Sequence, residues 1–133
     1  QHPSKPLAKT RQGTLAGSAE QGIHIWRGIP YAAPPVGPLR WRAPQPPARW
    51  QGVRQADAFS AASWQDIDYC RELGGGDPGA FSEDCLYLNV WAPASAAQPL
   101  PVMVWLHGGG FTIGAGGLPP YNGKALENVA WLL

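Results

Sequence analysis

An apolar run that ends abruptly in three glycines constrains the fold of this chain most. Residues 102–106 read Val-Met-Val-Trp-Leu, and residues 107–111 read His-Gly-Gly-Gly-Phe. A continuous apolar run of this length is typical of a central strand that is covered on both faces of a sheet. Glycines allow positive φ and let backbone N–H groups come close to a ligand. The pattern therefore predicts a central strand that leads into a backbone anion site.

Two more segments near this run have the character of strands. Residues 86–91 alternate large and polar side chains, and residues 129–133 form a short apolar run. Between the two apolar runs, Asn122 could cap a short helix over residues 123–128. Buried strands separated by a loop and a helix predict an α/β sheet.

The first half of the chain predicts extended structure. Residues 13–17 and 23–27 read as two strands of a hairpin around residues 18–22. Residues 28–50 hold seven of the chain's 15 prolines, which excludes a helix or a central strand there. We expect burial of Trp41 and Trp50 to hold this proline-rich segment on the surface.

The next segment, residues 53–81, gives no clear signal, and we expect irregular structure with one turn of helix.

Composition sets limits on function. Of the 133 residues, 44% are hydrophobic, which is enough for a core, and the net charge of +1 argues against nucleic acid as the main partner. No apolar run approaches the roughly 20 residues that cross a bilayer. The chain begins without Met, which fits a processed or an engineered start.

Cys70 and Cys85 are too few for a four-ligand zinc site and lack redox C-x-x-C spacing. We expect a local disulfide that closes the glycine-rich residues 74–79 and contributes roughly 3 kcal/mol. Such a bond would place the protein in an oxidising compartment, the periplasm or the exterior. Two buried free thiols in a cytosolic protein are the alternative.

The glycine run fits the chemistry of acyl transfer. Backbone N–H groups gathered at one point stabilise the oxygen anion of a tetrahedral intermediate, and His-Gly-Gly-Gly after a strand is an oxyanion-hole sequence of lipases and esterases. A phosphate-binding Walker loop would need glycine at Leu118, and a dinucleotide fingerprint from Gly114 would need glycine at Pro119. A purely structural glycine turn is the remaining alternative.

Three blocks of sequence together resemble the type-B carboxylesterases (the carboxylesterase/cholinesterase family). They are Gly-Ile-Pro-Tyr-Ala-Ala-Pro-Pro-Val-Gly-Pro-Leu-Arg (28–40), Ser-Glu-Asp-Cys-Leu-Tyr-Leu-Asn-Val-Trp (82–91) and Pro-Val-Met-Val-Trp-Leu-His-Gly-Gly-Gly-Phe (101–111), with Trp50 between the first two. The resemblance implies an α/β-hydrolase fold. It also implies that residues 1–133 are the N-terminal part of a single domain, with the remainder of that domain outside this chain.

The resemblance assigns roles in and around the glycine run. Gly109 and Gly110 would supply two N–H groups of the oxyanion hole, and a third would come from the residue after the nucleophile. His107 and Gly108 would support the loop, and Phe111 would line the substrate pocket.

The resemblance also implies two contacts outside the loop. Cys70 and Cys85 would form the family's first disulfide. Arg40 would pair with Glu83 and fix the proline-rich segment to the core.

Two departures from the family pattern limit the assignment. Residues 71–84 contain no tryptophan to hold a choline cation, which disfavours choline esters. No G-x-S-x-G nucleophile elbow occurs in these residues, so the serine, the acidic residue and the catalytic histidine would lie beyond residue 133.

The leading hypothesis is a secreted or periplasmic serine carboxylesterase. It would act on a small-molecule ester through an acyl-serine, without a cofactor or metal, and without a membrane span or nucleic-acid partner. The rest of its own chain, as a separate fragment, is a further candidate partner. The rival hypothesis is a catalytically inactive, cholinesterase-like adhesion or binding domain.

Overall fold

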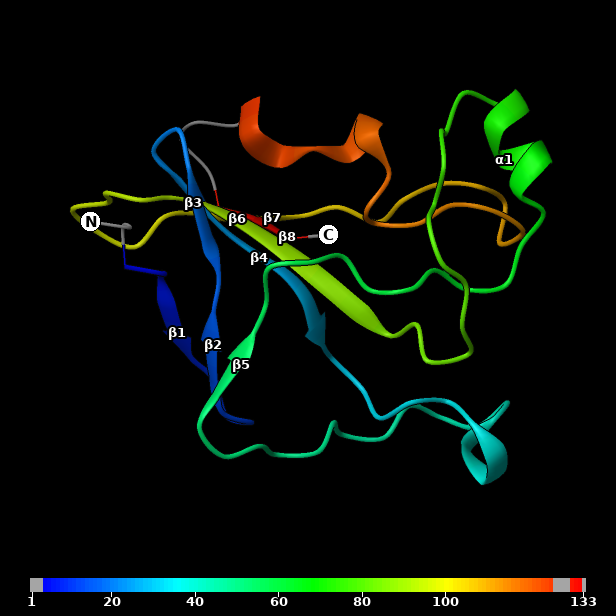
Figure 1. Cartoon of the computed structure of the whole chain (residues 1–133), viewed down its shortest axis with the longest axis horizontal. Coiled ribbons are helices and arrows are strands. Elements are labelled where there is room, and N and C mark those ends of the chain that lie inside the picture. Colours follow the sequence, from blue (N-terminus) through cyan, green and yellow to red (C-terminus); the bar gives the residue numbers. More distant parts are fainter. Residues whose placement is uncertain (1–3, 126–129, 133) are drawn as a thin grey trace.

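The computed structural model describes residues 4–125 and 130–132 as two sheets with one short helix (Figure 1). The three-stranded sheet has the order β1 (Leu7–Lys9), β2 (Thr14–Ala16) and β5 (Val53–Gln55). The five-stranded sheet has the order β3 (Ser18–Glu20), β4 (Ile23–Pro30), β6 (Tyr87–Pro93), β8 (Ala130–Leu132) and β7 (Val102–Val104). Helix α1 spans Ile67–Glu72, and single 3-10 turns cover Gly37–Leu39, Pro119–Tyr121 and Gly123–Ala125.

The hairpin lies later in the chain than the sequence predicts. Residues 18–20, expected in the turn, form β3 and pair antiparallel with β4. The turn is the two-residue pair Gln21 and Gly22, both with positive φ (48° and 80°). Such turns match the twist of the flanking strands, so they place β3 rather than β2 beside β4. Strand β2 instead pairs antiparallel with β1 and parallel with β5.

A bulge in β4 connects the two sheets. The β4–β6 register shifts between Trp26 and Ile29, and Gly28 between them has a φ of 74°. The Gly28 N–H donates to Oδ1 of the buried Asn89 (3.0 Å) on β6. The N–H of Arg27 donates to Ala56 O (2.8 Å), just after β5. Neighbouring amides of β4 therefore bond to different sheets.

The large buried side chains of the core lie on β2, β4 and β6. Ile23, Ile25 and Trp91 form one buried cluster, and Leu15 is buried in β2. The Trp91 ring also contacts Phe59, with ring centroids 6.4 Å apart. Burial of these large side chains is the main stabilising term for this region.

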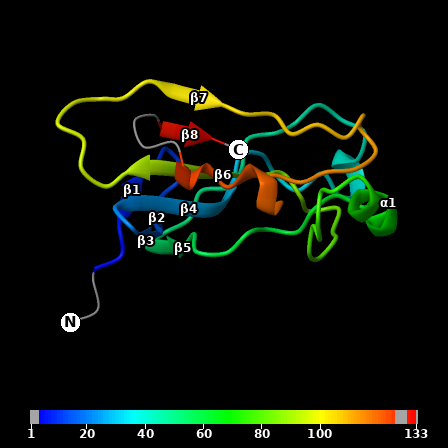
Figure 2. The same cartoon turned by 90° about the horizontal axis from the view of Figure 1, so that it is seen from above.

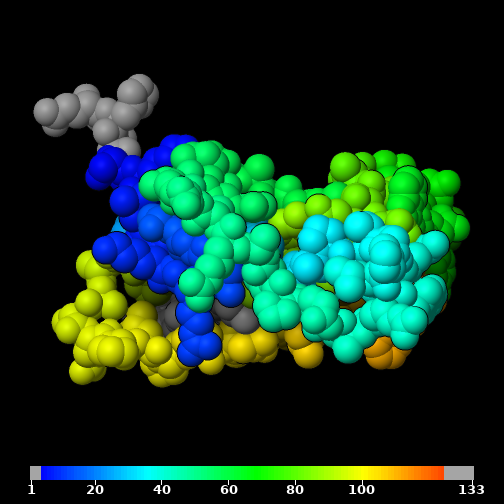
Figure 3. Space-filling view, turned by 90° about the horizontal axis from the view of Figure 1, so that it is seen from below, coloured from blue at the N-terminus to red at the C-terminus, as the bar shows by residue number. Residues whose placement is uncertain are grey.

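The proline-rich segment is extended as predicted, apart from one 3-10 turn, and it crosses the face shown in Figure 3. Trp50 is half-buried, and its indole N–H donates to Thr14 O (2.9 Å), which attaches the end of the segment to β2. The predicted burial of Trp41 is wrong, because its side chain is 95% exposed. Trp41 follows the turn with a φ of 59°, which directs its side chain outward.

Residues 53–81, for which the sequence gives no clear signal, contain β5 and α1. Asp66 caps α1, its carboxylate accepting from the N–H groups of Asp68 and Tyr69. The expected turn of helix is confirmed, whereas strand β5 was missed. No helix in the described ranges is long and apolar enough to cross a membrane.

Strands β6, β7 and β8 form where the sequence predicts strands, and β7 and β8 are parallel. Within the described residues, β7 is not covered on both faces, and its place as a central strand of the complete domain stays a prediction. It lies at one edge of the sheet (Figure 2), with Val102 62% and Val104 59% exposed. In the described part of the chain, β8 is its one strand neighbour.

The helix expected over residues 123–128 is a 3-10 turn at Gly123–Ala125. Asn122 Oδ1 accepts from the Lys124 N–H (3.1 Å), as a capping residue would. The rest of that expected helix, residues 126–128, lies outside the described residues, as do residues 129 and 133 at the ends of the strand expected over 129–133.

Candidate functional site

The His-Gly-Gly-Gly sequence follows β7 and forms a tight turn. Figures 1 and 2 show this segment extending from β7 to the end of the molecule where α1 lies. Gly109 O accepts from Thr112 N (3.0 Å), Ile113 N (3.3 Å) and the Thr112 hydroxyl (3.0 Å). Gly109 has a φ of 124°, and a Cβ there would lie 1.9 Å from Ile113 O. This turn, residues 107–114, is called the glycine loop below; its backbone requires glycine at position 109.

Several carbonyls of the glycine loop accept hydrogen bonds, whereas the N–H groups of residues 107–111 have no acceptor among the described residues. The N–H groups of Gly109 and Gly110 have no hydrogen-bond acceptor among the described residues. In a planar trans peptide the N–H points opposite to the C=O of the same unit. Because three donors hold Gly109 O, they also fix the direction of the Gly110 N–H. The two amides predicted as anion donors are adjacent and available.

His107 packs within the glycine loop. Its Nδ1 lies 2.9 Å from Gly108 O, and its ring stacks on Tyr121 at 6.5 Å between centroids and 24° between planes. Gly114 is so close to the ring that a Cβ there would lie 2.6 Å from His107 Nδ1. These contacts hold the ring against the loop backbone, and the supporting role of His107 stays a prediction. Tyr121 was not identified from the sequence, where no local pattern links it to His107.

Phe111 lies at the outer side of the glycine loop. Its side chain is fully exposed and its φ is 63°, a left-handed conformation that costs roughly 1–2 kcal/mol for a residue with a Cβ. Leu106 is also exposed. The role of Phe111 in a substrate pocket stays a prediction, because Phe111 lines neither of the two cavities described below. The glycine loop and the exposed residues of β7 present an apolar surface to the outside.

The structure brings Arg40 and Glu83 together. Arg40 Nε lies 2.8 Å from Glu83 Oε1, which links the turn of the proline-rich segment to the residues before β6. Both side chains are at least 40% exposed, so the pair contributes about 1 kcal/mol at most.

The predicted disulfide between Cys70 and Cys85 is wrong: both residues are free thiols. Cys70 is buried on α1, and its sulfur packs against Gly75. Cys85 lies instead near Tyr31, and partial burial together with Asp84 raises the pKa of its thiol. The two sulfurs pack in separate environments, which sequence spacing could not reveal. The oxidising compartment that this bond implied stays a prediction.

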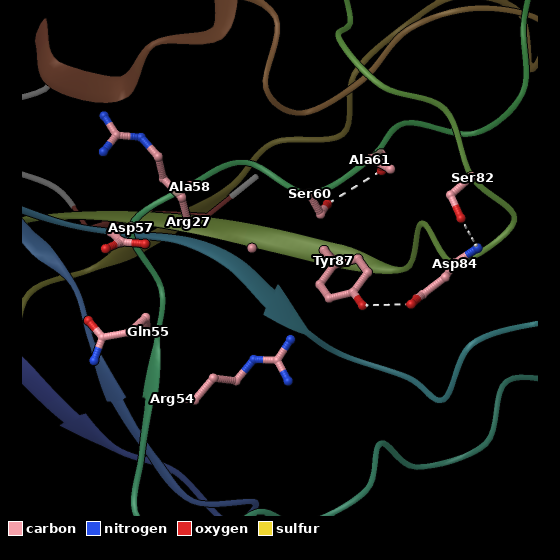
Figure 4. Close-up of a pocket in the computed structure, with 11 residues that line it drawn as sticks. Arg27, Arg54, Gln55, Asp57, Ala58, Ser60, Ala61, Ser82, Asp84 and Tyr87 are labelled. Atoms are coloured by element: carbon pink, nitrogen blue, oxygen red, sulfur yellow. Dashed lines mark hydrogen bonds between the residues drawn. The ribbon is translucent and has the colours of Figure 1, made fainter.

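A polar cavity of about 360 Å³ lies away from the glycine loop, between the residues after β5 and those before β6 (Figure 4). The Tyr87 hydroxyl donates to Asp84 Oδ2 (3.0 Å), and Arg54 reaches across the cavity toward Tyr87. Burial and then Asp84 raise the pKa of Tyr87.

Two serines line this cavity, and neither has an adjacent base. Ser60 Oγ donates to Ala61 O, and Ser82 Oγ accepts from the Asp84 N–H. The cavity therefore offers no activated nucleophile. A second cavity of about 390 Å³ lies beside the hairpin turn, at Gln21 and Lys124. No cluster of three metal-ligating side chains occurs in residues 4–125 and 130–132.

Comparison with known proteins assigns the family. The family model described as "Carboxylesterase family" matches residues 4–130. The chain belongs to the carboxylesterase family. It is 47% identical over 125 residues to phenmedipham hydrolase of Pseudarthrobacter oxydans, covering 89% of this chain and 24% of that protein. It is 46% identical over 120 residues to para-nitrobenzyl esterase of Bacillus subtilis (strain 168), covering 90% and 24%.

Solved structures agree with this assignment. A PNB esterase matches with a TM-score of 0.90 at 43% identity, over 97% of this chain and 27% of that chain. A carboxylesterase of Geobacillus stearothermophilus matches with a TM-score of 0.82 at 40% identity, over 95% and 25%. The predicted family and the α/β-hydrolase fold are confirmed. This carboxylesterase-family chain spans about a quarter of the length of these relatives.

Proposed function

We propose that the complete protein hydrolyses carboxylic esters and that this chain supplies its oxyanion hole. Membership of the carboxylesterase family supports the reaction class, as do relatives named as esterases and hydrolases. The substrate class is a small-molecule ester, and the chemistry requires no cofactor. The same proposal places the protein in the periplasm or outside the cell.

The reaction runs through an acyl-serine. The hydroxyl oxygen of a serine outside these residues attacks the ester carbonyl carbon, and the carbonyl π electrons move to its oxygen. The N–H groups of Gly109 and Gly110 donate to that oxygen anion. Collapse of the intermediate breaks the bond to the alcohol, which leaves with a proton. In the first step the catalytic histidine outside these residues takes the serine proton and gives it to the leaving alcohol.

Water then attacks the acyl carbon while the histidine takes its proton, and the same amides stabilise the second intermediate. That intermediate collapses by breaking the bond to the serine oxygen, which regains the proton, and the carboxylic acid leaves.

One observation carries the oxyanion role: the Gly109 and Gly110 amides have no acceptor in the described structure, while Gly109 O has three donors. An unpaired amide in a fixed peptide unit is preorganised for a developing negative charge. The N–H groups of His107, Gly108 and Phe111 also have no acceptor in the described structure, so the Gly109–Gly110 peptide is set apart by the carbonyl that three donors fix.

The test uses the complete protein with p-nitrophenyl butyrate and a fluorophosphonate probe that labels activated serines. We expect ester turnover, a pre-steady-state burst of p-nitrophenol, and loss of both turnover and labelling when the serine of the nucleophile elbow is replaced by alanine. Absence of turnover and of labelling in the correctly folded protein would indicate the inactive binding domain instead.

A further inference from the structure

Gln65, just before the cap of α1, makes a two-point contact with the end of the glycine loop. Its Nε2 donates to Gly114 O (2.9 Å), and its Oε1 accepts from Gly114 N (2.8 Å). Its Nε2 also donates to Ser63 O (3.1 Å). The Gln65 side-chain amide thus pairs with the N–H and the C=O of one residue, as the backbone of a neighbouring strand would. This contact joins two segments that lie 49 residues apart.

Gly114 in turn lies directly against the peptide that carries one predicted oxyanion donor. It is buried, and a Cβ there would lie 2.6 Å from Gly108 O. Gly108 O and the Gly109 N–H belong to the same planar peptide unit and point in opposite directions. A shift of Gly114 would therefore remove the neighbour that packs against the Gly108 carbonyl, leave His107 Nδ1 (2.9 Å) as its remaining polar contact, and let the Gly109 N–H turn. Gln65 is the side chain that fixes Gly114.

We propose that Gln65 is a positioning residue of the oxyanion hole, which holds Gly114 against the Gly108 carbonyl and so directs the Gly109 N–H. This inference rests on the proposed function. It adds a residue from outside the glycine loop to the machinery that stabilises the anion.

The contact requires a carboxamide of this length. Nε2 faces two carbonyl oxygens, Ser63 O and Gly114 O, and uses both of its hydrogens, while Oε1 faces an N–H. A carboxylate would place an anionic oxygen against those two carbonyl oxygens. A shorter amide would lose contact with Gly114.

Other contacts hold the rest of this region in place without Gln65. Gly117 packs on the ring of Phe59, where a Cβ would lie 2.9 Å from the ring. Leu118 is buried close to Gly75, which also contacts Cys70. Loss of the Gln65 contact is therefore expected to loosen the Gly109 peptide without unfolding the segment, so its effect falls on the rate of reaction.

The experiment compares Gln65→Glu and Gln65→Ala in the complete protein. Gln45→Glu is the matched control, because Gln45 Nε2 also donates to a carbonyl two residues back (Ala43 O, 3.2 Å) but lies in the proline-rich segment. We expect both Gln65 variants to lose roughly 10- to 100-fold in kcat with KM within about threefold, since misplacement by about 1 Å can cost about 10²-fold. The control should match the wild type.

Two readouts separate positioning from general damage to the fold. Affinity for a trifluoromethyl ketone, which forms a tetrahedral oxyanion on the serine, should fall by the same factor as kcat/KM. In Gln65→Glu, the ratio of kcat to that of the wild type should rise as the pH falls, because the protonated carboxyl can again donate to a carbonyl oxygen. The pH dependence of this kcat ratio tests the positioning role of Gln65 even if Gln65→Ala folds poorly.

The outcomes are distinct. An inactive wild-type protein overturns the proposed function and this inference with it. An active wild type, with Gln65 variants that keep kcat and inhibitor affinity, overturns the inference alone. So does a loss of activity in Gln65→Glu that is the same at every pH and accompanies a loss of folded protein.

Discussion

The two ends of the five-stranded sheet are held by different forces. At the β4–β6 end, Ile25 is 0% and Trp91 2% exposed, and the buried Asn89 satisfies the bulge in β4. At the β7 end, the apolar side chains of Val102 and Val104 face outward, and the backbone of the glycine loop is fixed by hydrogen bonds. Burial stabilises the first region, whereas polar contacts shape the second.

This difference indicates that stability and site geometry can be changed separately. Substitutions near Trp91 should lower the free energy of unfolding, and substitutions in the glycine loop should lower the rate. The separation holds because the contacts to Gly109 O and to Gly114 involve local backbone groups and one distant amide, not the buried cluster.

The largest effect is expected at the core. Trp91→Ala should lower the free energy of unfolding of the complete protein by about 3–5 kcal/mol, through lost apolar burial and the cavity left behind. Trp41→Ala is the matched control, because Trp41 is 95% exposed, and it should change stability by about 0.5 kcal/mol or less. Urea denaturation measures both. Equal effects of the two substitutions would remove the basis of the comparison.

The next effect concerns rate. Gly109→Ala should lower kcat by about 10²–10³-fold, because its Cβ would lie 1.9 Å from Ile113 O and the turn must open. Gly22→Ala controls for backbone strain, since Gly22 has a φ of 80° in the hairpin turn but open space around its Cβ position. Steady-state kinetics and thermal unfolding should show slow turnover with a folded core in Gly109→Ala, and normal turnover in Gly22→Ala. Full activity of Gly109→Ala would contradict the oxyanion role.

The sequence predicts these two regions to different extents. The strands of β6, β7 and β8 are recognisable because their apolar and alternating patterns are local. The family follows from three long blocks, which include the glycine loop. The shift of the hairpin to β3 was not predictable, since Gln21 is not a residue that usually marks a turn with positive φ.

Contacts between distant segments were the least predictable. Nothing local in the sequence indicates that Gln65 bonds Gly114, because that contact depends on how α1 packs against the loop. The same reason explains the error on Cys70 and Cys85: spacing gives loop length but not the direction of either sulfur. Trp41 and Trp50 lie in one proline-rich segment, yet one is exposed and the other is bonded to Thr14 O.

The smallest effect is expected at β3, the edge strand opposite to β7. Glu20 on β3 forms ion pairs with Lys124, beside the hairpin turn, and with Arg27 on β4 (3.4 Å). The hydrogen bond from Lys124 is the main cause that lowers the pKa of Glu20. A carboxyl with a lowered pKa in the folded state stabilises the fold above its ordinary pKa, and that contribution is lost as the pH falls through the lowered value.

Glu20→Gln should therefore lower the free energy of unfolding at pH 7 by less than about 1 kcal/mol, because the paired side chains are partly exposed and screened. The difference from the wild type should vanish at a pH well below the ordinary glutamate pKa of about 4.3, and it should shrink in high salt. Glu72→Gln is the control, since Glu72 has no ion-pair partner in the described ranges, and it should change the free energy of unfolding at pH 7 by about 0.5 kcal/mol or less. If Glu20→Gln also lowered kcat, the ion pairs would couple the core to the glycine loop, and the two regions would not be separable.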